Sequence, residues 1–367
     1  MQRRELLKRT ALAAGAFAFS RDTFAGLFND KVMQLPIGEK IIKIGSNENP
    51  HGPSALAKKA MIDAVSGSNR YPWDVTTKLR ERIGTLFNLT KDNVVIGAGS
   101  SELLGVTATW AALQKGTAIA PDPTFRLWIP AAKRLGLPVN LIPLTEDKVT
   151  DLPKMKAAID ASTKLIYICN PNNPTGSIIP APELEAFIKS TPKHIVILLD
   201  EAYTEFSNEP SMAHLVNTHP NLVIAKTFSK VYGLAGARVG YVLAHADTAK
   251  QLADLQPWAN AGASAVSLAG ALATLDDKNF IPHCRTENEK AKQIFYRVLS
   301  EHGMRYIPSH TSFVYFDATR YHKDVKTVLE AKNIFGARTF EEGTKWLRLS
   351  IGTVDEMRAV AKALNEA

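Results

Sequence analysis

The sequence predicts an α/β fold, in which a mostly parallel central sheet has helices on both faces and a smaller α/β domain is attached. Short runs of β-branched and leucine residues recur at 93–96, 164–169, 194–199 and 221–224. Uninterrupted apolar runs of this length are typical of strands that are buried on both faces. Helical patterns such as residues 181–189 lie between the runs, which favours parallel pairing.

The chain is long enough for two domains, since it has 367 residues of which 45% are hydrophobic. We expect residues 60–257 to form the large domain. Residues 26–59, as an N-terminal arm, should join residues 258–367, which contain a linker helix and a strand near 312–316. Ligands of parallel sheets bind beyond the carboxyl ends of the strands. The large domain is therefore expected to carry the main binding site.

Polar clusters follow four of the predicted strands, and parallel pairing would bring them to one crevice. The first contains Gly99, Ser100 and Ser101 ahead of a helical pattern. Free N–H groups and the positive end of the helix dipole would attract a phosphate there. An ordinary serine N-cap is the alternative interpretation.

Asp200 ends a strand of six apolar residues, where a carboxylate is costly without a cationic partner. A protonated pyridine nitrogen would be such a partner and would keep the ring an electron sink. Tyr203 and Asn173 could hydrogen-bond a phenolic oxygen on the same ring. The alternatives are an Asp that caps the next turn and a Pro/Asn-rich loop that is only a turn.

Lys230 follows another apolar run, between hydroxyls and close to Arg238 in a glycine-rich loop. An amine in this position suits a Schiff base with an aldehyde cofactor that carries a phosphate. Alone, it could equally be a surface lysine in a turn. The four clusters together favour the cofactor site, because unrelated turns would not place an amine, an acid, an amide and a phosphate-binding loop at one edge of the sheet.

These segments resemble a known family in order and in sequence. The matching stretches are NENPHGPS at 47–54, NRYP at 69–72, GAGSSELL at 97–104, PTFRLW at 123–128, NNPTG at 172–176, DEAYTEF at 200–206, TFSKVYGLAGARVG at 227–240 and WLRLSIGT at 346–353. The chain resembles a fold-type I pyridoxal-phosphate aminotransferase of class I/II, closest to the histidinol-phosphate aminotransferase branch. Any one stretch would be a weak signal, but together they are specific.

The resemblance implies a role for each matched residue around the cofactor ring. Lys230 would form the Schiff base and carry a proton between the substrate α-carbon and the cofactor. Asp200 would pair with the pyridinium nitrogen, while Asn173 and Tyr203 would bond the ring oxygen. Trp128 would stack on the ring face, where the branch usually has Tyr.

The resemblance also implies how the phosphate is held and that two subunits share each site. Backbone N–H groups and polar side chains would bind the phosphate, namely those of Ser100, Ser101, Thr227, Ser229 and Arg238. Tyr71 would reach the phosphate from the neighbouring subunit of a homodimer. Arg348 would bind the substrate α-carboxylate, its alternative being a strand-edge arginine in a surface ion pair.

Substrate recognition is left open by the residues. Arg338 lies near the position where the branch contacts the phosphate of histidinol phosphate, but it could equally bind a distal carboxylate or be a solvated surface charge. The chain departs from the branch in two places: Ser101 stands where Asp is common, and the segment 257–264 is rich in small residues. These departures leave amino acids other than histidinol phosphate open as substrates. The expected reaction moves an amino group between an L-amino acid, or an amino alcohol phosphate such as histidinol phosphate, and a 2-oxo acid. The alternatives are decarboxylation of a phosphorylated amino acid, as in threonine-phosphate decarboxylase, and a non-enzymatic cofactor-binding protein.

The N-terminus predicts export. Arg3 and Arg4 precede a short, alanine-rich apolar stretch at 10–19, which is too short to cross a membrane. Residues 1–25 therefore resemble a twin-arginine-type signal peptide for the periplasm. A leader that stays in the cytoplasm is the alternative.

Composition limits the other classes of function. The net charge is +8, but basic residues are dispersed, which argues against nucleic-acid binding. No further stretch is long enough for stable membrane association, and the two cysteines, Cys169 and Cys284, have no metal-ligand spacing. An anionic cofactor and small-molecule amino acid and 2-oxo acid substrates account for some of the positive charge.

Overall fold

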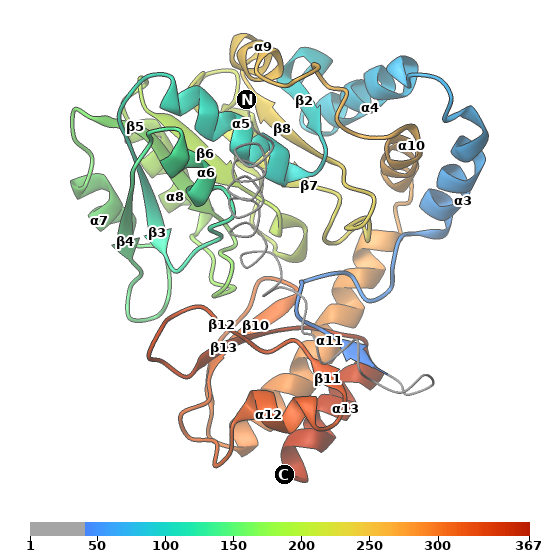
Figure 1. Cartoon of the computed structure of the whole chain (residues 1–367), viewed down its shortest axis with the longest axis vertical. Helices are drawn as coiled ribbons and strands as arrows, with labels where there is room; N and C mark the ends of the chain where they lie inside the picture. The colour runs from blue at the N-terminus through green and yellow to red at the C-terminus, as the bar shows by residue number, and fades with distance from the viewer. Residues whose placement is uncertain (1–40) are drawn as a thin grey trace, which may run out of the picture.

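The computed structural model describes residues 41–367, and the export signal predicted at 1–25 lies outside the described residues. Figure 1 shows two lobes, an upper one around a large sheet and a lower one around a smaller sheet. The long helix α11, Phe280–Glu301, runs from the upper lobe into the lower one. The described part of the chain thus has the α/β architecture that the sequence predicts.

The large sheet has seven strands in the order β2-β8-β7-β6-β5-β3-β4. Their bounds are β2 Val94–Gly97, β3 Thr117–Asp122, β4 Val139–Pro143, β5 Thr163–Cys169, β6 Val196–Asp200, β7 Leu222–Thr227 and β8 Gly240–Ala244. Only β8 runs antiparallel to its neighbours, β2 and β7. The other neighbouring strands are parallel, which confirms the predicted mostly parallel sheet.

Helices cover both faces of this sheet. They are α4 Trp73–Leu86, α5 Ser100–Ala112, α6 Ile129–Arg134, α7 Leu152–Ala157, α8 Ala181–Ser190, α9 Ala246–Asp254 and α10 Ala265–Thr274. Helix α3, Ala55–Ala64, packs on α10. Short 3₁₀ turns lie at Val65–Gly67, Lys91–Asn93, Thr204–Phe206 and Met212–Leu215. Helices α5, α6 and α9 pack on one face, and α4, α7, α8 and α10 on the other.

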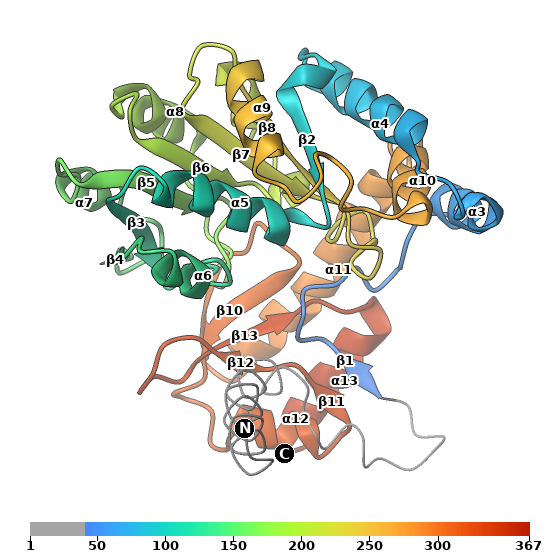
Figure 2. The ribbon, with the colours of Figure 1, turned by 45° about the horizontal axis from the view of Figure 1, so that its top comes forward.

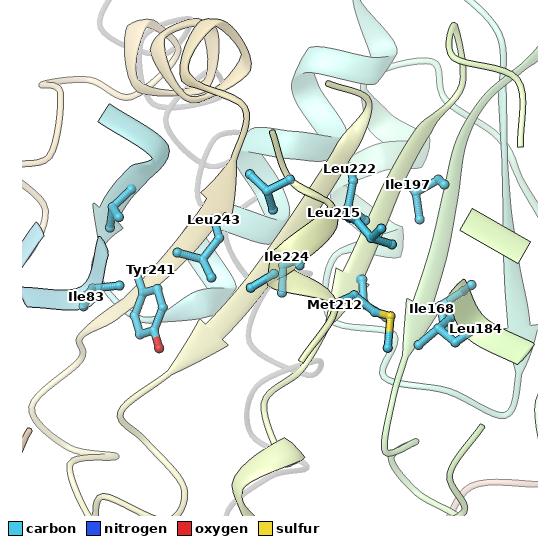
Figure 3. Packing of buried hydrophobic residues seen from close by; sticks show 14 of the residues in the cluster. Ile83, Ile168, Leu184, Ile197, Met212, Leu215, Leu222, Ile224, Tyr241 and Leu243 are labelled. Carbon is cyan, nitrogen blue, oxygen red and sulfur yellow. The ribbon is translucent and has the colours of Figure 1, made fainter. Parts of the chain in front are cut away.

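Alternating residues of each central strand enter different cores. In β5, Ile166 and Ile168 join the cluster under α8, while Leu165 and Tyr167 join the cluster under α5. Figure 3 shows the first cluster, in which Ile168 lies close to Leu184 of α8. Because successive strand side chains point to opposite faces, a strand buried on both faces must be apolar throughout. This is why the strands appear as continuous apolar runs in the sequence.

The lower lobe contains an antiparallel sheet in the order β12-β13-β10-β9. Its elements are β9 Arg305–Ile307, β10 Phe313–Asp317, α12 Val325–Glu330, β12 Arg338–Thr339, β13 Trp346–Ser350 and α13 Val354–Asn365. The arm joins this lobe, since β1, Ile42–Lys43, pairs in parallel with β11, Ile334–Phe335. Figures 1 and 2 both show these two short strands in the lower lobe.

The domain boundaries proposed after residues 59 and 257 stay predictions. Helix α3 continues across residue 60 and lies against α10. Helix α10 follows residue 257, and its Leu268 and Ala271 belong to the same apolar cluster as the large sheet. Within residues 41–367, no helix has the length and apolar character that crossing a membrane would need.

Candidate active site

A cavity of about 770 Å³ lies between the lobes, at the carboxyl ends of the parallel strands. It brings together most of the residues that the sequence singled out, namely Ser100, Ser101, Asn173, Asp200, Tyr203, Thr227, Ser229, Lys230, Arg238, Arg338 and Arg348. The segments after β2, β5, β6 and β7 supply the residues of the upper lobe. β12 and β13 supply the two arginines of the lower lobe.

One end of the cavity is suited to an anion. Helix α5 begins at Ser100, and the first-turn N–H groups of a helix have no partner within it. Gly99 has a φ of 81°, and a Cβ there would overlap Nη2 of Arg238, so the guanidinium lies directly against the helix start. Arg238 is held there because its Nη1 donates to the Ala235 carbonyl at 2.9 Å and to Ser229 Oγ at 3.4 Å. A phosphate would meet a guanidinium, hydroxyls and free amides together.

Asp200 ends β6 and is 3% exposed. Its carboxylate accepts hydrogen bonds from Tyr167 Oη at 3.0 Å and from the Ala202 N–H at 3.1 Å. Burial raises the pKa of Asp200 to about 6, although these bonds and the charge of Lys230 oppose the rise. Both hydrogen-bond donors are uncharged, so a protonated ring nitrogen would supply the missing positive charge.

Lys230 projects into the same cavity and donates from Nζ to the Ser46 carbonyl at 3.3 Å. Burial lowers the pKa of this amine to about 8, and the positive charges of Arg348 and Arg238 act in the same direction. Glu48 and Asp200 oppose them only in part. A larger share of this amine than of an ordinary lysine is therefore neutral near neutral pH, and the neutral amine is the form that attacks an aldehyde.

Arg348 is buried, with 5% of its surface exposed, so it is not a strand-edge arginine in a surface ion pair. Its Nη1 donates to Asn173 Oδ1 at 2.6 Å, and its Nη2 donates to the Gly45 carbonyl at 2.8 Å. The guanidinium lies 4.7 Å from the ring centroid of Phe340. Its Nε is buried without a hydrogen-bond partner, which leaves a donor for a carboxylate.

Arg338 lines the same cavity as Arg348 and is half-buried. Its Nη2 donates to Ser46 Oγ at 3.4 Å. Burial lowers the pKa of Arg338, against the attraction of Glu48. No carboxylate of residues 41–367 forms an ion pair with it, so it can contact an anionic part of a ligand.

The structure does not bring Trp128 to the cavity, which corrects the expected stacking role. Trp128 is 2% exposed and packs against Tyr167, with 5.1 Å between the ring centroids. It is the residue before α6, so its side chain is enclosed by that helix and the sheet. Phe125, three residues earlier, lines the cavity instead.

Tyr71 also lies outside the cavity of its own chain. It is 68% exposed and stacks on Trp73 with 5.4 Å between ring centroids. Trp258 completes a group of three exposed aromatic side chains. This position is compatible with a contact to another subunit.

Three further residues, to which no sequence pattern gives a role, contact the site in the structure. Tyr167 hydrogen-bonds Asp200, and the only indication of this in the sequence is a single phenol within an otherwise aliphatic strand. Asn47 and Glu48 belong to the NENP stretch, which marked the family but gave no indication of contacts. Asn47 donates to Tyr203 Oη, and Glu48 lines the cavity. In residues 41–367 no group of histidine, cysteine and carboxylate side chains could hold a metal ion.

Comparison with known proteins gives one family match across most of the chain. The family described as "Aminotransferase class I and II" matches residues 39–364. A histidinol-phosphate aminotransferase from Bacillus velezensis is 34% identical, over 89% of this chain and 92% of that protein. Histidinol-phosphate aminotransferase 1 from Dechloromonas aromatica is 36% identical, over 91% of this chain and 92% of that protein.

A solved structure agrees with the sequence matches. Histidinol-phosphate aminotransferase from Sinorhizobium meliloti, in complex with pyridoxal-5'-phosphate, superposes with a TM-score of 0.82. It is 26% identical, and the superposition covers 92% of this chain and 96% of that one.

Proposed function

We propose that this chain catalyses transamination. It belongs to the class I and II aminotransferase family and is a pyridoxal-phosphate enzyme of the histidinol-phosphate aminotransferase-like branch. The reaction moves an amino group between an L-amino acid, or an amino alcohol phosphate such as histidinol phosphate, and a 2-oxo acid. The observation that carries this proposal is the Lys230 amine, whose pKa is lowered to about 8, in one cavity with Asp200 and Arg348.

The cavity residues fit pyridoxal phosphate. The phosphate would lie between Arg238 and the start of α5, with Ser100, Ser101, Thr227 and Ser229 around it. Asp200 would hold the ring nitrogen protonated, and Asn173 and Tyr203 would bond the ring oxygen. Phe125 would face the ring in place of Trp128. When bound, the cofactor supplies an aldehyde that condenses with amines and a ring that accepts the electron pair of a broken α-carbon bond.

Lys230 would act twice in this reaction. Its neutral Nζ would attach covalently to the cofactor, and once displaced by the substrate amine it would take a proton from the substrate α-carbon. A base is most effective when its pKa lies near the working pH, and the surroundings of Lys230 lower its pKa towards that range. Burial between the lobes would keep bulk water away from this step.

Arg348 would bind the substrate carboxylate through its unpartnered Nε. Its hydrogen bond to Asn173 connects it to a residue that would contact the cofactor ring. Arg338 would contact either the phosphate of histidinol phosphate or a distal carboxylate. Decarboxylation of a phosphorylated amino acid has less support, since the matched family and the relatives above are aminotransferases.

A donor screen tests the proposal. Holoenzyme mixed with single amino acids or histidinol phosphate should lose the absorbance of the aldehyde form, and addition of a 2-oxo acid should restore it. Release of carbon dioxide without amino transfer would favour the decarboxylase. Absence of any spectral change across a full donor panel would contradict both reactions.

We propose a homodimer with shared sites, in which Tyr71 reaches the phosphate of the other subunit. Its exposure, and its absence from the cavity of its own chain, support this. Sedimentation should give twice the chain mass, and Tyr71→Phe should weaken cofactor retention. A monomer with full activity would contradict the proposal.

We also propose that residues 1–25 direct export to the periplasm. The paired Arg3 and Arg4 and the short apolar stretch after them support it. Fractionated cells should contain a shortened protein in the periplasm, and Arg3→Lys/Arg4→Lys should retain it in the cytosol. Full-length wild-type protein confined to the cytosol would contradict export.

A further inference from the structure

Asn47 connects the N-terminal arm to both lobes at a point beside the cofactor cavity. It is 2% exposed, lines the cavity and has a left-handed φ of 54°. Its Nδ2 donates to Tyr203 Oη at 2.9 Å, its Oδ1 accepts from Ser350 Oγ at 2.7 Å, and its backbone N–H donates to the same Oγ at 2.9 Å. All polar atoms of the Asn47 side chain are thus engaged.

This arrangement fixes which end of the amide faces Tyr203. The Ser350 hydroxyl has one hydrogen, and its oxygen already accepts from the Asn47 backbone, so the hydrogen is directed to Oδ1. With Oδ1 engaged, Nδ2 points at Tyr203. In the reversed orientation, this pair would leave the Ser350 hydrogen without its acceptor.

Tyr203 therefore receives a hydrogen bond on its oxygen, and its own hydrogen stays available for the cavity. The phenol is 3% exposed, and burial raises its pKa, so it retains that hydrogen at working pH. Phe313 holds the ring edge-on, with centroids 5.1 Å apart. Lys230 Nζ lies 5.6 Å from the same ring centroid, which places the hydroxyl in the neighbourhood of the reacting amine.

We propose that Asn47, oriented by Ser350, is a positioning residue that makes Tyr203 a hydrogen-bond donor to the ring oxygen of the cofactor. This rests on the role proposed above for Tyr203. Donation to that oxygen draws electron density from the ring and makes the Lys230 nitrogen that is bonded to the cofactor a weaker base. Asn47 thus acts on the proton chemistry of Lys230 through Tyr203 without touching the amine.

The left-handed backbone of Asn47 permits two matched substitutions. Asn47→Gly removes the amide at a φ that glycine tolerates, and Asn47→Asp keeps the shape at a φ that aspartate tolerates. The aspartate exchanges a donor for an acceptor, so it would attract the Tyr203 hydrogen away from the cavity. Arg348, Asp200 and Cys169 also act on Tyr203, and both variants leave them unchanged.

The test is a pH titration of the absorbance of the bound cofactor in the holoenzyme, together with cofactor retention on dialysis. Tyr203→Phe should raise the midpoint and serves as the reference. Asn47→Gly should raise it in the same direction by about 0.4 to 1 pH unit, the equivalent of one hydrogen bond. Asn47→Asp should raise it further. Asn49→Ala is the control, since Asn49 lies two residues further along the arm and donates to the Val231 carbonyl and Cys284 Sγ but not to Tyr203.

The outcomes separate this inference from the proposed function. A shift for Tyr203→Phe with none for Asn47→Gly or Asn47→Asp would overturn the inference alone, and a lowered melting temperature would then show that Asn47 only holds the arm. An unchanged midpoint in Tyr203→Phe would overturn both the inference and the proposed role of Tyr203. An equal shift in Asn49→Ala would show a general loosening of the arm and would also contradict the inference.

Discussion

Two lysines, four residues apart, have opposite surroundings: Lys226 is buried, and Lys230 is partly buried at the wall of the cavity. Lys226 Nζ, in β7, lies 3.2 Å from Glu201 Oε2 and 2.9 Å from Glu205 Oε1, and its side chain is 3% exposed. Burial alone would lower the pKa of Lys226, but Glu205 and Glu201 reverse this and raise it. For Lys230 burial is reinforced by Arg348, and the pKa falls to about 8.

The comparison shows that the charged neighbours of a lysine removed from bulk water decide whether it stays charged or can react. Lys226 remains charged because two carboxylates compensate it, and such a group has no neutral amine to react. For Lys230, burial and then the Arg348 charge lower the pKa, and Glu48 and Asp200 oppose them only in part, so the amine can lose its proton. The following predictions test this contrast, from the largest expected effect to the smallest.

Lys230→Ala should reduce kcat by about 10⁴-fold, because the covalent attachment and the proton transfer are both lost. Cofactor should still bind through its phosphate. Steady-state rates on refolded, cofactor-loaded protein would measure this. A rate within tenfold of the wild type would remove Lys230 from the mechanism.

Lys226→Met should act on stability instead. It leaves Glu201 buried without its cation, which should cost about 3–5 kcal/mol of unfolding free energy. Urea unfolding would measure the loss, and adding Glu201→Gln should recover part of it. Activity per folded molecule should stay close to wild type; a collapse of kcat without loss of stability would break the contrast between the two lysines.

Asp200→Asn should change stability in a pH-dependent way in the cofactor-free protein. Because burial raises the pKa of Asp200 from 3.8 to about 6, the folded state loses stability as pH rises between these values. The variant should therefore be more stable by up to about 3 kcal/mol at pH 8, and by only about 0.6 kcal/mol at pH 4. Melting curves at both pH values would show it. Equal melting curves of variant and wild type at pH 8 would mean that burial does not destabilise the ionised Asp200. Transamination should fall in either case.

The pH dependence of cofactor attachment is the smallest expected effect. The rate at which cofactor-free protein reacts with pyridoxal phosphate should rise with pH and reach half its limit near pH 8, since the neutral amine is the reactant. Arg348→Gln should move the midpoint upward, because the Arg348 charge lowers the pKa of Lys230. A wild-type midpoint near 10 would contradict the proposed electrostatics.

Sequence patterns were sufficient to predict the central strands and the residues that follow them. Thr163–Cys169 and Leu222–Thr227 are strands because apolar runs buried on both faces leave little alternative, and the residues after them enter the cavity by parallel pairing. The sequence could not predict the opposite pKa shifts of Lys226 and Lys230, because these depend on Glu205 and Arg348 in other elements of the fold.

Side-chain direction was the second limit. The family resemblance places Trp128 at the ring face, yet its side chain lies in the core under α6 while Phe125 lines the cavity. The Asn47–Ser350 pair joins residues 303 positions apart, so no local pattern could indicate it. Tyr71 requires a second subunit, which a single sequence does not describe.

Borohydride reduction of the holoenzyme, followed by peptide mass analysis, tests the central claim most directly. The account predicts that the reduced cofactor is attached to the peptide with Lys230, at that residue, and that Lys226 in the same peptide region is unmodified. Attachment to Lys226, or to no lysine in a protein that retains its cofactor, would contradict it.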